Sequence, residues 1–293
     1  MRLGVHVSTA GNIYDAVDRA RELGCTSMQI FSRNPQRKRE VFLSGEDIGE
    51  FVARLKTANI KPFFIHAPYT VNLASPDKGL WKRSIKVYIE DIREAFKLRA
   101  DYIVTHMGSH KETSEEEGTA RFIQALNCII EKTADTPVGL LLENVAGSGS
   151  WIGHHFFQQK QVIDALADKS RVGLCLDTAH AYSAGYDVAT REGLKDVLDE
   201  IDALVGLDRL KLIHLNDTKD ALGSHRDRHE HIGQGRIGSA GMKRIVTSRR
   251  LQHAAFILET PKDSGDSDRM NLEVVRGFMK KRPGSREAGF SGG

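Results

Sequence analysis

The feature of this sequence that most restricts its fold is a short apolar run that ends at a histidine or a carboxylate and recurs six times. The runs are FFI before His66, YIVT before His106, VGLLL before Glu143, VGLCL before Asp177, LKLI before His214 and AAFIL before Glu259. Continuous apolar runs of this length are typical of strands in a parallel sheet that is covered on both faces. Successive members lie 34 to 45 residues apart, which is the length of one strand followed by one helix. We therefore expect a polar residue at the end of each of six strands.

Strand and helix patterns alternate through the whole chain. Further strands are expected at 3–7 and 26–31, and helices at 13–23, 46–58, 79–98, 115–132, 158–168, 194–205, 240–248 and 272–281. Eight parallel strand–helix units in one uninterrupted chain predict an α/β fold, the (β/α)8 TIM barrel, as a single domain over residues 1–282 with a disordered tail at 283–293. The alternative is an open doubly wound sheet, which usually has a G-x-G-x-x-G fingerprint after its first strand. This sequence has none there.

A barrel of this kind would bring the six polar residues together. Active sites of such barrels lie at the C-terminal ends of the strands, so residues far apart in the chain share one pocket. Carboxylates and imidazoles together favour a divalent cation such as zinc. For a single strand, a strand-end histidine is more often structural, and an aspartate that caps the next turn explains the residue equally well. It is the repetition that favours a metal site. His6, in the first expected strand, either supports the metal shell by a hydrogen bond or is a buried structural histidine.

Three more candidate ligands lie outside the strand ends. His180 follows Asp177 on the expected loop, and Asp227 and His229 belong to the charged segment DRHEH after His214. Residues two apart in an extended segment can point to the same side of the backbone. Taken alone, DRHEH is more simply a solvated charged loop. Together with the strand ends, however, nine residues are available, which is too many for a single tetrahedral zinc and predicts a cluster of ions.

Composition sets only broad limits. The chain has 40% hydrophobic and 28% charged residues, a net charge of +3 and three cysteines without a CxxC spacing. These values are typical of a globular protein with reduced thiols, and the basic balance is compatible with a polyanionic partner. No membrane span or secretory signal is visible, so we expect a cytoplasmic protein without a membrane partner. A monomer is the default expectation.

The motifs around these residues resemble those of the endonuclease IV family of abasic-site (AP) endonucleases, AP endonuclease family 2, over about residues 2–281. The motifs are HAPYTVNLASPD from His66, LLLENVAG through Glu143, LDTAHAYSAGYD through Asp177, HLNDTKD from His214, DRHEHIGQG from Asp227 and ILETP through Glu259. The resemblance implies a barrel with a centre of three zinc ions (Zn2+). Mn²⁺ can replace Zn²⁺ where carboxylates predominate.

The resemblance also implies which residues hold which ion and what reaction follows. His66, His106 and Glu143 would hold one ion, Glu143 would bridge to a second ion held by Asp177, His214 and Glu259, and His180, Asp227 and His229 would hold the third. The implied activity is metal-dependent hydrolysis of double-stranded DNA 5′ to an abasic site in base excision repair, which leaves a 3′-hydroxyl and a 5′-deoxyribose phosphate. Glu143 would be the catalytic residue, acting with a metal-bound hydroxide. Cleaning of blocked 3′ ends is a related implied activity.

Candidate DNA contacts come from two loops. They are Arg33, Asn34, Gln36, Arg37 and Tyr69. The first four lie in the basic segment SRNPQRKRE, for which a solvated basic face is an equally good interpretation. That segment lacks the aromatic residue that often follows the basic residues in the family. Tyr69 matches a family position that packs into DNA beside the abasic gap, and its simpler role is packing in the wall of the barrel mouth.

Two other functions remain open at this stage. A metal-dependent sugar isomerase can use strand-end carboxylates and histidines on the same type of barrel, because fold alone does not assign chemistry. A non-catalytic protein that binds DNA lesions could use the same cluster for structure. The nine-residue ligand set and the basic loop favour DNA over a sugar as the substrate.

Overall fold

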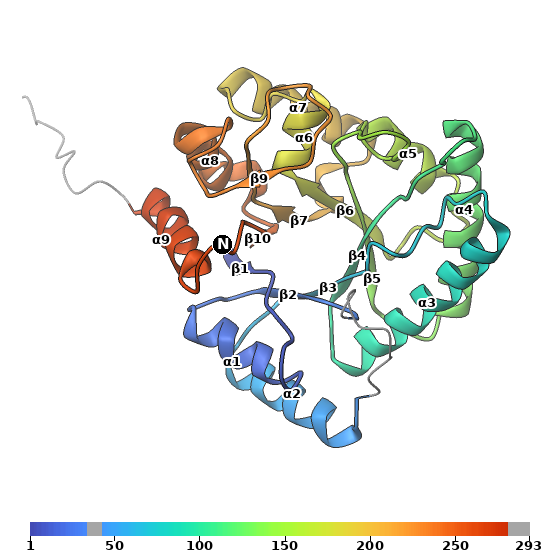
Figure 1. The fold of residues 1–293 in the computed structure, drawn as a ribbon, viewed down its shortest axis with the longest axis horizontal. Helices are drawn as coiled ribbons and strands as arrows, with labels where there is room; N and C mark the ends of the chain where they lie inside the picture. Colours follow the sequence, from blue (N-terminus) through green and yellow to red (C-terminus); the bar gives the residue numbers. More distant parts are fainter. Residues whose placement is uncertain (34–42, 281–293) are drawn as a thin grey trace, which may run out of the picture.

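Residues 1–33 and 43–280 are described by a computed structural model, and they form a barrel of parallel strands surrounded by helices (Figure 1). Neighbouring strands follow the order β1 (Arg2–Val5), β10 (Ala255–Leu258), β7 (Leu210–His214), β6 (Val172–Asp177), β5 (Gly139–Glu143), β4 (Tyr102–His106), β3 (Phe63–His66) and β2 (Met28–Phe31). The ring closes between β1 and β2, where His6 and Gln29 form an isolated parallel bridge. The predicted (β/α)8 TIM barrel is confirmed.

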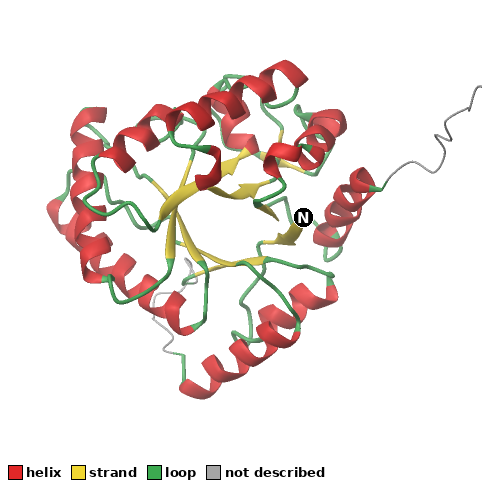
Figure 2. Ribbon diagram, turned by 180° about the vertical axis from the view of Figure 1, so that it is seen from behind, coloured by secondary structure: helices red, strands yellow, loops and turns green. Residues whose placement is uncertain are grey.

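The main helices lie outside the ring of strands, as Figure 2 shows from the opposite side. They are α1 (Asp15–Glu22), α2 (Gly45–Thr57), α3 (Lys78–Lys97), α4 (Glu115–Lys132), α5 (Phe156–Asp164), α7 (Arg191–Leu204), α8 (Gly238–Thr247) and α9 (Ser267–Met279). Local sequence fixes several starts: Ser44 and Ser114 each form a capping box at the beginning of α2 and α4. Within the part of the chain that the structure describes, every helix is too short or too polar to cross a membrane.

Strand residues alternate between two apolar cores. One core lies between the sheet and the helices and includes Val5, Ile30 and Ile65. The other fills the barrel interior and consists of Phe64, Val104, Leu141, Cys175, Leu212, Ala255 and Ile257. Because strand side chains alternate with a period of two, the second residue after an interior one points inward again. For six strands that residue is polar, namely His66, His106, Glu143, Asp177, His214 and Glu259.

Two elements near the mouth were not expected from the sequence. A short helix, α6 (Thr178–Ala184), follows β6 directly, and an antiparallel pair, β8 (Asp217–Thr218) with β9 (His229–Glu230), folds the long segment after β7. Two short 3₁₀ helices, η1 (Leu207–Arg209) and η2 (Arg249–Leu251), precede β7 and β10. The expected tail at 283–293 lies outside the described residues.

Candidate metal centre

The inward polar residues form one layer at the C-terminal mouth of the barrel, and all eight strands contribute to it. The layer consists of His6, Gln29, His66, His106, Glu143, Asp177, His214 and Glu259. Gln29, Glu143, Asp177 and His214 have no exposed surface. The structure thus brings together the six strand-end residues that the sequence analysis selected. Burying so many ionisable groups is unfavourable unless they are paired with each other or with ions.

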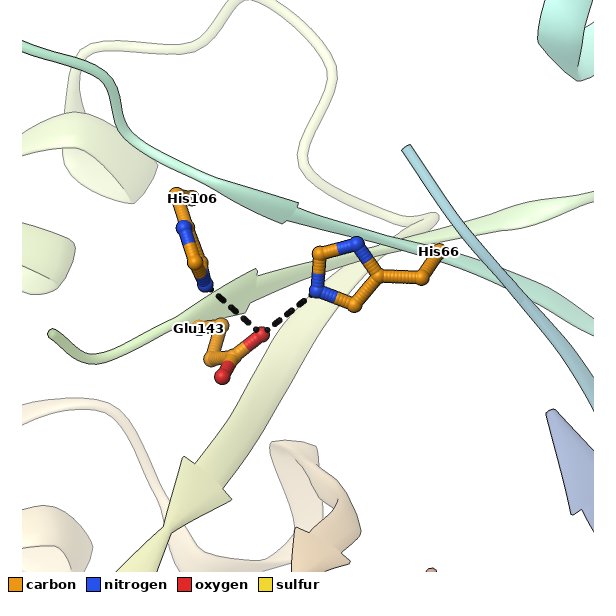
Figure 3. A group of neighbouring side chains, drawn as sticks. All are labelled: His66, His106 and Glu143. Atoms are coloured by element: carbon orange, nitrogen blue, oxygen red, sulfur yellow. Dashed lines mark hydrogen bonds and ion pairs between the residues drawn. The ribbon is translucent and has the colours of Figure 1, made fainter. Parts of the chain in front are cut away.

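Glu143 stands at the centre of this layer. Its Oε2 lies 3.0 Å from His66 Nε2 and 3.3 Å from His106 Nε2 (Figure 3). Its Oε1 lies 3.1 Å from His214 Nδ1 and 3.3 Å from His180 Nδ1. Burial alone would raise the pKa of this carboxyl group, but His214 and His106 hold the pKa well below its usual range. Glu143 therefore stays ionised, and its two oxygens face four imidazole rings.

A second group of ligand atoms lies on the Oε1 side of Glu143. His214 Nδ1 is 3.4 Å from Glu259 Oε2 and 4.0 Å from Asp177 Oδ2. Ligand atoms of Glu143, Asp177, His214 and Glu259 all lie within 4.8 Å of one another. Burial opposes ionisation of Glu259, but His214 and His6 hold the pKa of Glu259 far below its usual range. Four side chains could therefore converge on one cation at this place.

The third group joins the mouth of the barrel to the loop after β7. His180 Nε2 lies 3.2 Å from Asp227 Oδ2, and His229 Nε2 lies 3.3 Å from Asp227 Oδ1. His229 Nε2 is also 3.8 Å from Asp177 Oδ2, so Asp177 is within reach of the second and third groups. Burial alone would lower the pKa of His229, but the nearby carboxylates of Asp227 and Asp177 raise the pKa to about 9.

The position of His180 corrects one expectation. His180 was expected on a loop, but it lies on α6, whose N-cap is Asp177. Asp177 Oδ1 accepts a hydrogen bond from the His180 main-chain N at 2.7 Å. The interpretation of Asp177 as a capping residue is therefore right for one oxygen, whereas Oδ2 faces the histidines. An aspartate at a strand end followed at once by a helix can do both, because the N-cap uses a single acceptor.

Three histidines are held in the orientation that metal ligands require. The Nδ1–H groups of His66, His180 and His229 donate to the main-chain carbonyls of Ala67, Asn144 and Glu259 at 2.6, 2.9 and 2.8 Å. A ring nitrogen that donates to a carbonyl carries a proton, so the other nitrogen is the one that can give up its proton and coordinate a cation. His229 Nε2 is buried and forms no hydrogen bond with the described residues, although Asp227 Oδ1 lies 3.3 Å away. Imidazole and carboxylate donors in this arrangement fit divalent cations such as zinc.

Cys175 also lies within reach of Glu143 and His214. Burial raises the pKa of its thiol to about 12, so the thiol is protonated near neutral pH and is a poor ligand. Its place in the interior core identifies it as a packing residue. The donor set is therefore made of nitrogen and oxygen atoms.

Two asparagines that the sequence analysis missed hold candidate ligands in place. Asn144 Oδ1 accepts from the Asp177 main-chain N at 2.8 Å, and Asn144 Nδ2 donates to the Asp177 carbonyl at 3.1 Å. Asn216 Nδ2 donates to Asp177 Oδ2 at 2.7 Å, and Asn216 Oδ1 accepts from the Glu259 main-chain N at 2.8 Å. The signal for both was their position, because each follows a ligand candidate within two residues.

A third missed residue, Asp217, anchors the loop that carries Asp227 and His229. The Asp217 carboxylate is fully buried and accepts main-chain N–H groups from Gly233, Gly235, Ile237 and Gly238 at 3.0 to 3.2 Å. A Cβ on Gly235 would lie 2.4 Å from Asp217 Oδ1, so this close approach requires glycine. The segment GQGRIG thus wraps around one carboxylate.

Two of the five predicted DNA-contact residues, Arg33 and Tyr69, lie among the described residues. Arg33 is half-buried and turns toward α3, where its Nε lies 2.5 Å from Asp91 Oδ1 and its Nη2 lies 3.0 Å from Glu90 Oε2. Tyr69 is 59% exposed on the loop after β3. Asn34, Gln36 and Arg37 lie outside the described residues. A role in DNA contact stays a prediction for all five.

The ion pair of Arg33 with Asp91 leads to a test of pH dependence. Burial raises the pKa of Asp91 to about 6, even though Arg33 and Ser32 act in the opposite direction. The folded chain binds the proton of the Asp91 carboxyl group more tightly than the unfolded chain does. Protonation of Asp91 therefore stabilises the fold fully below pH ~4, and this stabilisation is lost as the pH rises through about 6. Asparagine does not titrate, so the free energy of unfolding of Asp91→Asn, relative to that of the wild type, should rise by up to about 3 kcal/mol between pH 4 and 7. Denaturant unfolding at a series of pH values measures the difference.

Glu90→Gln is the matched control for this substitution. Glu90 pairs with the same Arg33, but its side chain is 40% exposed. Its difference from the wild type should not grow in the same way over this pH range. A constant difference for Asp91→Asn across the range would contradict the prediction.

Comparison with known proteins agrees with this geometry. A family model described as the xylose isomerase-like TIM barrel matches residues 17–282. "Probable endonuclease 4" of Halothermothrix orenii is 42% identical over 277 residues, which cover 94% of this chain and 99% of that protein. The crystal structure of endonuclease IV from Thermus thermophilus has a TM-score of 0.84 and 37% identity, covering 95% of this chain and 98% of that one.

A different enzyme class shares the fold alone. The crystal structure of a D-tagatose 3-epimerase-like protein covers 95% of this chain and 97% of its own with a TM-score of 0.73, but it is only 18% identical. This chain matches almost the whole length of the two endonuclease relatives. Their shared name agrees with the resemblance seen in the motifs. The chain therefore belongs to the endonuclease IV family of DNA-cleaving hydrolases, within the xylose isomerase-like TIM barrels.

Proposed function

We propose that this protein hydrolyses the phosphodiester bond immediately 5′ to an abasic site in double-stranded DNA, as a step of base excision repair. The products would be a 3′-hydroxyl and a 5′-deoxyribose phosphate, and removal of blocked 3′ ends would be a related activity. The observation that carries the proposal is the ionised, fully buried Glu143, which faces four histidines at the mouth of the barrel. The names of the relatives of high identity support the same class of reaction.

The ligand set that supports this reaction has three parts. We propose that His66, His106 and Glu143 hold one Zn²⁺, that Glu143, Asp177, His214 and Glu259 hold a second, and that His180, Asp227 and His229 hold a third. The orientation of the histidines supports this assignment, and so does the buried Nε2 of His229, which forms no hydrogen bond but faces Asp227 and Asp177. Bound divalent cations would neutralise the phosphate, lower the pKa of water and stabilise the departing oxygen.

The chain's own residues supply orientation and selectivity. Because the pKa of Glu143 is held low, this carboxylate is a weak base, and its main role would be to accept a hydrogen bond from the attacking water and orient it. Asn144 and Asn216 keep Asp177 fixed while substrate binds. An abasic nucleotide has lost its base pair, so moving it out of the duplex costs less than moving an intact nucleotide.

A nicking assay tests the proposal directly. The substrate is a duplex with one tetrahydrofuran abasic analogue, and a panel of aldoses is run in parallel with the zinc-loaded protein. We expect a nick 5′ to the lesion whose 3′ end a polymerase can extend, together with repair of a primer blocked by a 3′-phosphate. Isomerisation of an aldose without nicking would favour the sugar isomerase instead. Tight binding of the lesion without nicking would favour a lesion-binding protein.

Tyr69 provides a test of DNA contact that leaves the metal centre untouched. Its ring is 59% exposed on the loop after β3, where it is free to stack on DNA. Stacking of a base on an aromatic ring contributes about 1–3 kcal/mol, so Tyr69→Ala should weaken binding of the abasic duplex by about tenfold or more. Fluorescence anisotropy with labelled duplex measures the affinity.

Phe96→Ala is a suitable control for Tyr69→Ala. Phe96 is also partly exposed, at 37%, but it lies at the C-terminal end of α3, shortly before β4 begins, and so at the end of the barrel opposite the mouth. Equal affinities of the two variants for the abasic duplex would mean that Tyr69 has no role in DNA contact.

Three broader expectations remain predictions. They are the single domain that ends at residue 282, the monomeric state and the cytoplasmic location. Sedimentation analysis of the purified protein, with and without abasic duplex, tests the monomeric state.

A further inference from the structure

Gln29 lies on β2 one inward position before the strand end, level with His6 of the neighbouring strand. It is fully buried, and it forms the bridge with His6 at the seam where the barrel closes. Its neighbours Met28 and Ile30 belong to the outer core, so the Gln29 side chain points into the barrel. A buried amide is stable only when its donor and acceptor both find partners.

Both ends of the Gln29 amide have a partner in the candidate metal centre. Nε2 donates to Glu259 Oε1 at 2.6 Å, and Oε1 lies 2.9 Å from His214 Nε2. A carboxylate only accepts hydrogen bonds, so the NH₂ end of the amide must face Glu259 and the oxygen must face His214. The amide oxygen in turn only accepts, so His214 Nε2 carries the proton of this bond.

The other ring nitrogen of His214 is directed at the cluster. His214 Nδ1 lies 3.1 Å from Glu143 Oε1 and 3.4 Å from Glu259 Oε2. Because Gln29 holds Oε1 of Glu259, Oε2 is left on the side of His214 Nδ1. One amide therefore sets the orientation of two side chains in the same group of candidate ligands.

Gln29 differs from the other supports of the histidines because it is a side chain. The second ring nitrogens of His66, His180 and His229 bond to main-chain carbonyls, which no substitution removes. Of these histidines and His214, only His214 depends on a side chain for this bond. His6 Nδ1, at 3.0 Å from Glu259 Oε1, adds a further contact to the same carboxylate.

We propose that Gln29 is a positioning residue that orients His214 and Glu259 toward the ion they would share with Glu143 and Asp177. The proposal rests on the metal centre of the proposed function. It goes beyond that centre by identifying a residue outside the ligand set that sets the affinity for one ion. Outer contacts of this kind commonly change metal affinity by about 10- to 100-fold.

The test compares Gln29→Met with the wild type in ion binding. Methionine keeps the length of the side chain and removes both hydrogen bonds. The full-length proteins are stripped of metal and titrated with Co²⁺, whose absorption spectrum reports ligand number and geometry, and then with Zn²⁺. We expect Gln29→Met to bind one ion about 10- to 100-fold more weakly, with an altered Co²⁺ spectrum. In a His214→Ala background the same substitution should have a smaller effect, because its main target is gone.

Gln159→Met is the matched control. Gln159 is almost as deeply buried, and its Nε2 donates to the Gly153 carbonyl at 2.9 Å. The proposal is wrong if Gln29→Met and Gln159→Met destabilise the metal-free protein equally while ion affinities and the Co²⁺ spectrum of Gln29→Met match the wild type. A wild type that takes up no ion at all would instead refute the metal centre of the proposed function.

A second variant covers the case in which Gln29→Met does not fold. Gln29→Glu keeps an acceptor for His214 but replaces the donor to Glu259 by a second carboxylate. Because that donor is lost, we expect affinity for one ion to fall by about tenfold. Wild-type affinity in Gln29→Glu would overturn the proposal.

Discussion

Glu143→Gln should abolish the nicking of abasic DNA while the barrel stays folded. Glutamine has the same shape but lacks the negative charge that four histidines share at 3.0 to 3.3 Å. Loss of an outer contact of a metal costs about 10- to 100-fold, so loss of a ligand common to two groups should cost more than about 100-fold in rate. Single-turnover nicking of a tetrahydrofuran duplex measures the rate, and circular dichroism verifies the fold.

Glu131→Gln makes the same chemical change at an exposed position of α4 and should nick at the wild-type rate. Nicking by Glu143→Gln within tenfold of the wild type would contradict the assignment of Glu143 as the catalytic residue. If the wild type binds the lesion without nicking it, and Glu143→Gln differs from the wild type only in affinity, the non-catalytic alternative would be favoured.

Removal of metal is the second change for which we expect a large effect. The carboxylates and histidines at the barrel mouth are buried together, and bound cations would neutralise their charges. Dialysis against a chelator should stop nicking, and Zn²⁺ should restore it. An ion that binds only the folded state adds about 4 kcal/mol of stability at a free concentration about 1,000 times its dissociation constant. Thermal unfolding with and without Zn²⁺ should therefore show a clear increase in the midpoint for the loaded protein.

Mg²⁺ is the control cation in this experiment, because it prefers oxygen ligands in octahedral geometry and this site offers imidazole nitrogens. Mg²⁺ should neither restore nicking nor raise the unfolding midpoint by a comparable amount. Full activity after chelation, with no metal in elemental analysis, would contradict the ion-dependent centre.

The sequence was sufficient to predict the barrel and the meeting of the six strand-end residues because both depend on short-range patterns. Apolar runs of strand length locate the strands, and the period of two sets the face on which the next polar residue lies. Glu143 and Glu259 lie 116 positions apart, yet the register of parallel strands brings them together once the barrel is assumed.

Other parts of the centre could not be predicted in this way. Gln29 lies between apolar residues in MQIF, and an amide at a strand position has no distinctive chemistry until its partners are known. The pairing of β8 with β9 brings His229 next to Asp177, and that contact depends on the path of a long loop. Asp217 resembled any acidic loop residue, because its role depends on four main-chain N–H groups that sequence patterns do not locate.

The anchoring of that loop by Asp217 bears on how the protein acquires its cations. The loop is fastened to the barrel by hydrogen bonds from main-chain amides to a fully buried carboxylate, which need no ion. If His180, Asp227 and His229 hold an ion as proposed, their arrangement should therefore keep its shape when the ion leaves, and a replacement should enter from solution without refolding. The metal composition of the protein should accordingly follow the supply available when the protein works, rather than the supply present when the chain was synthesised.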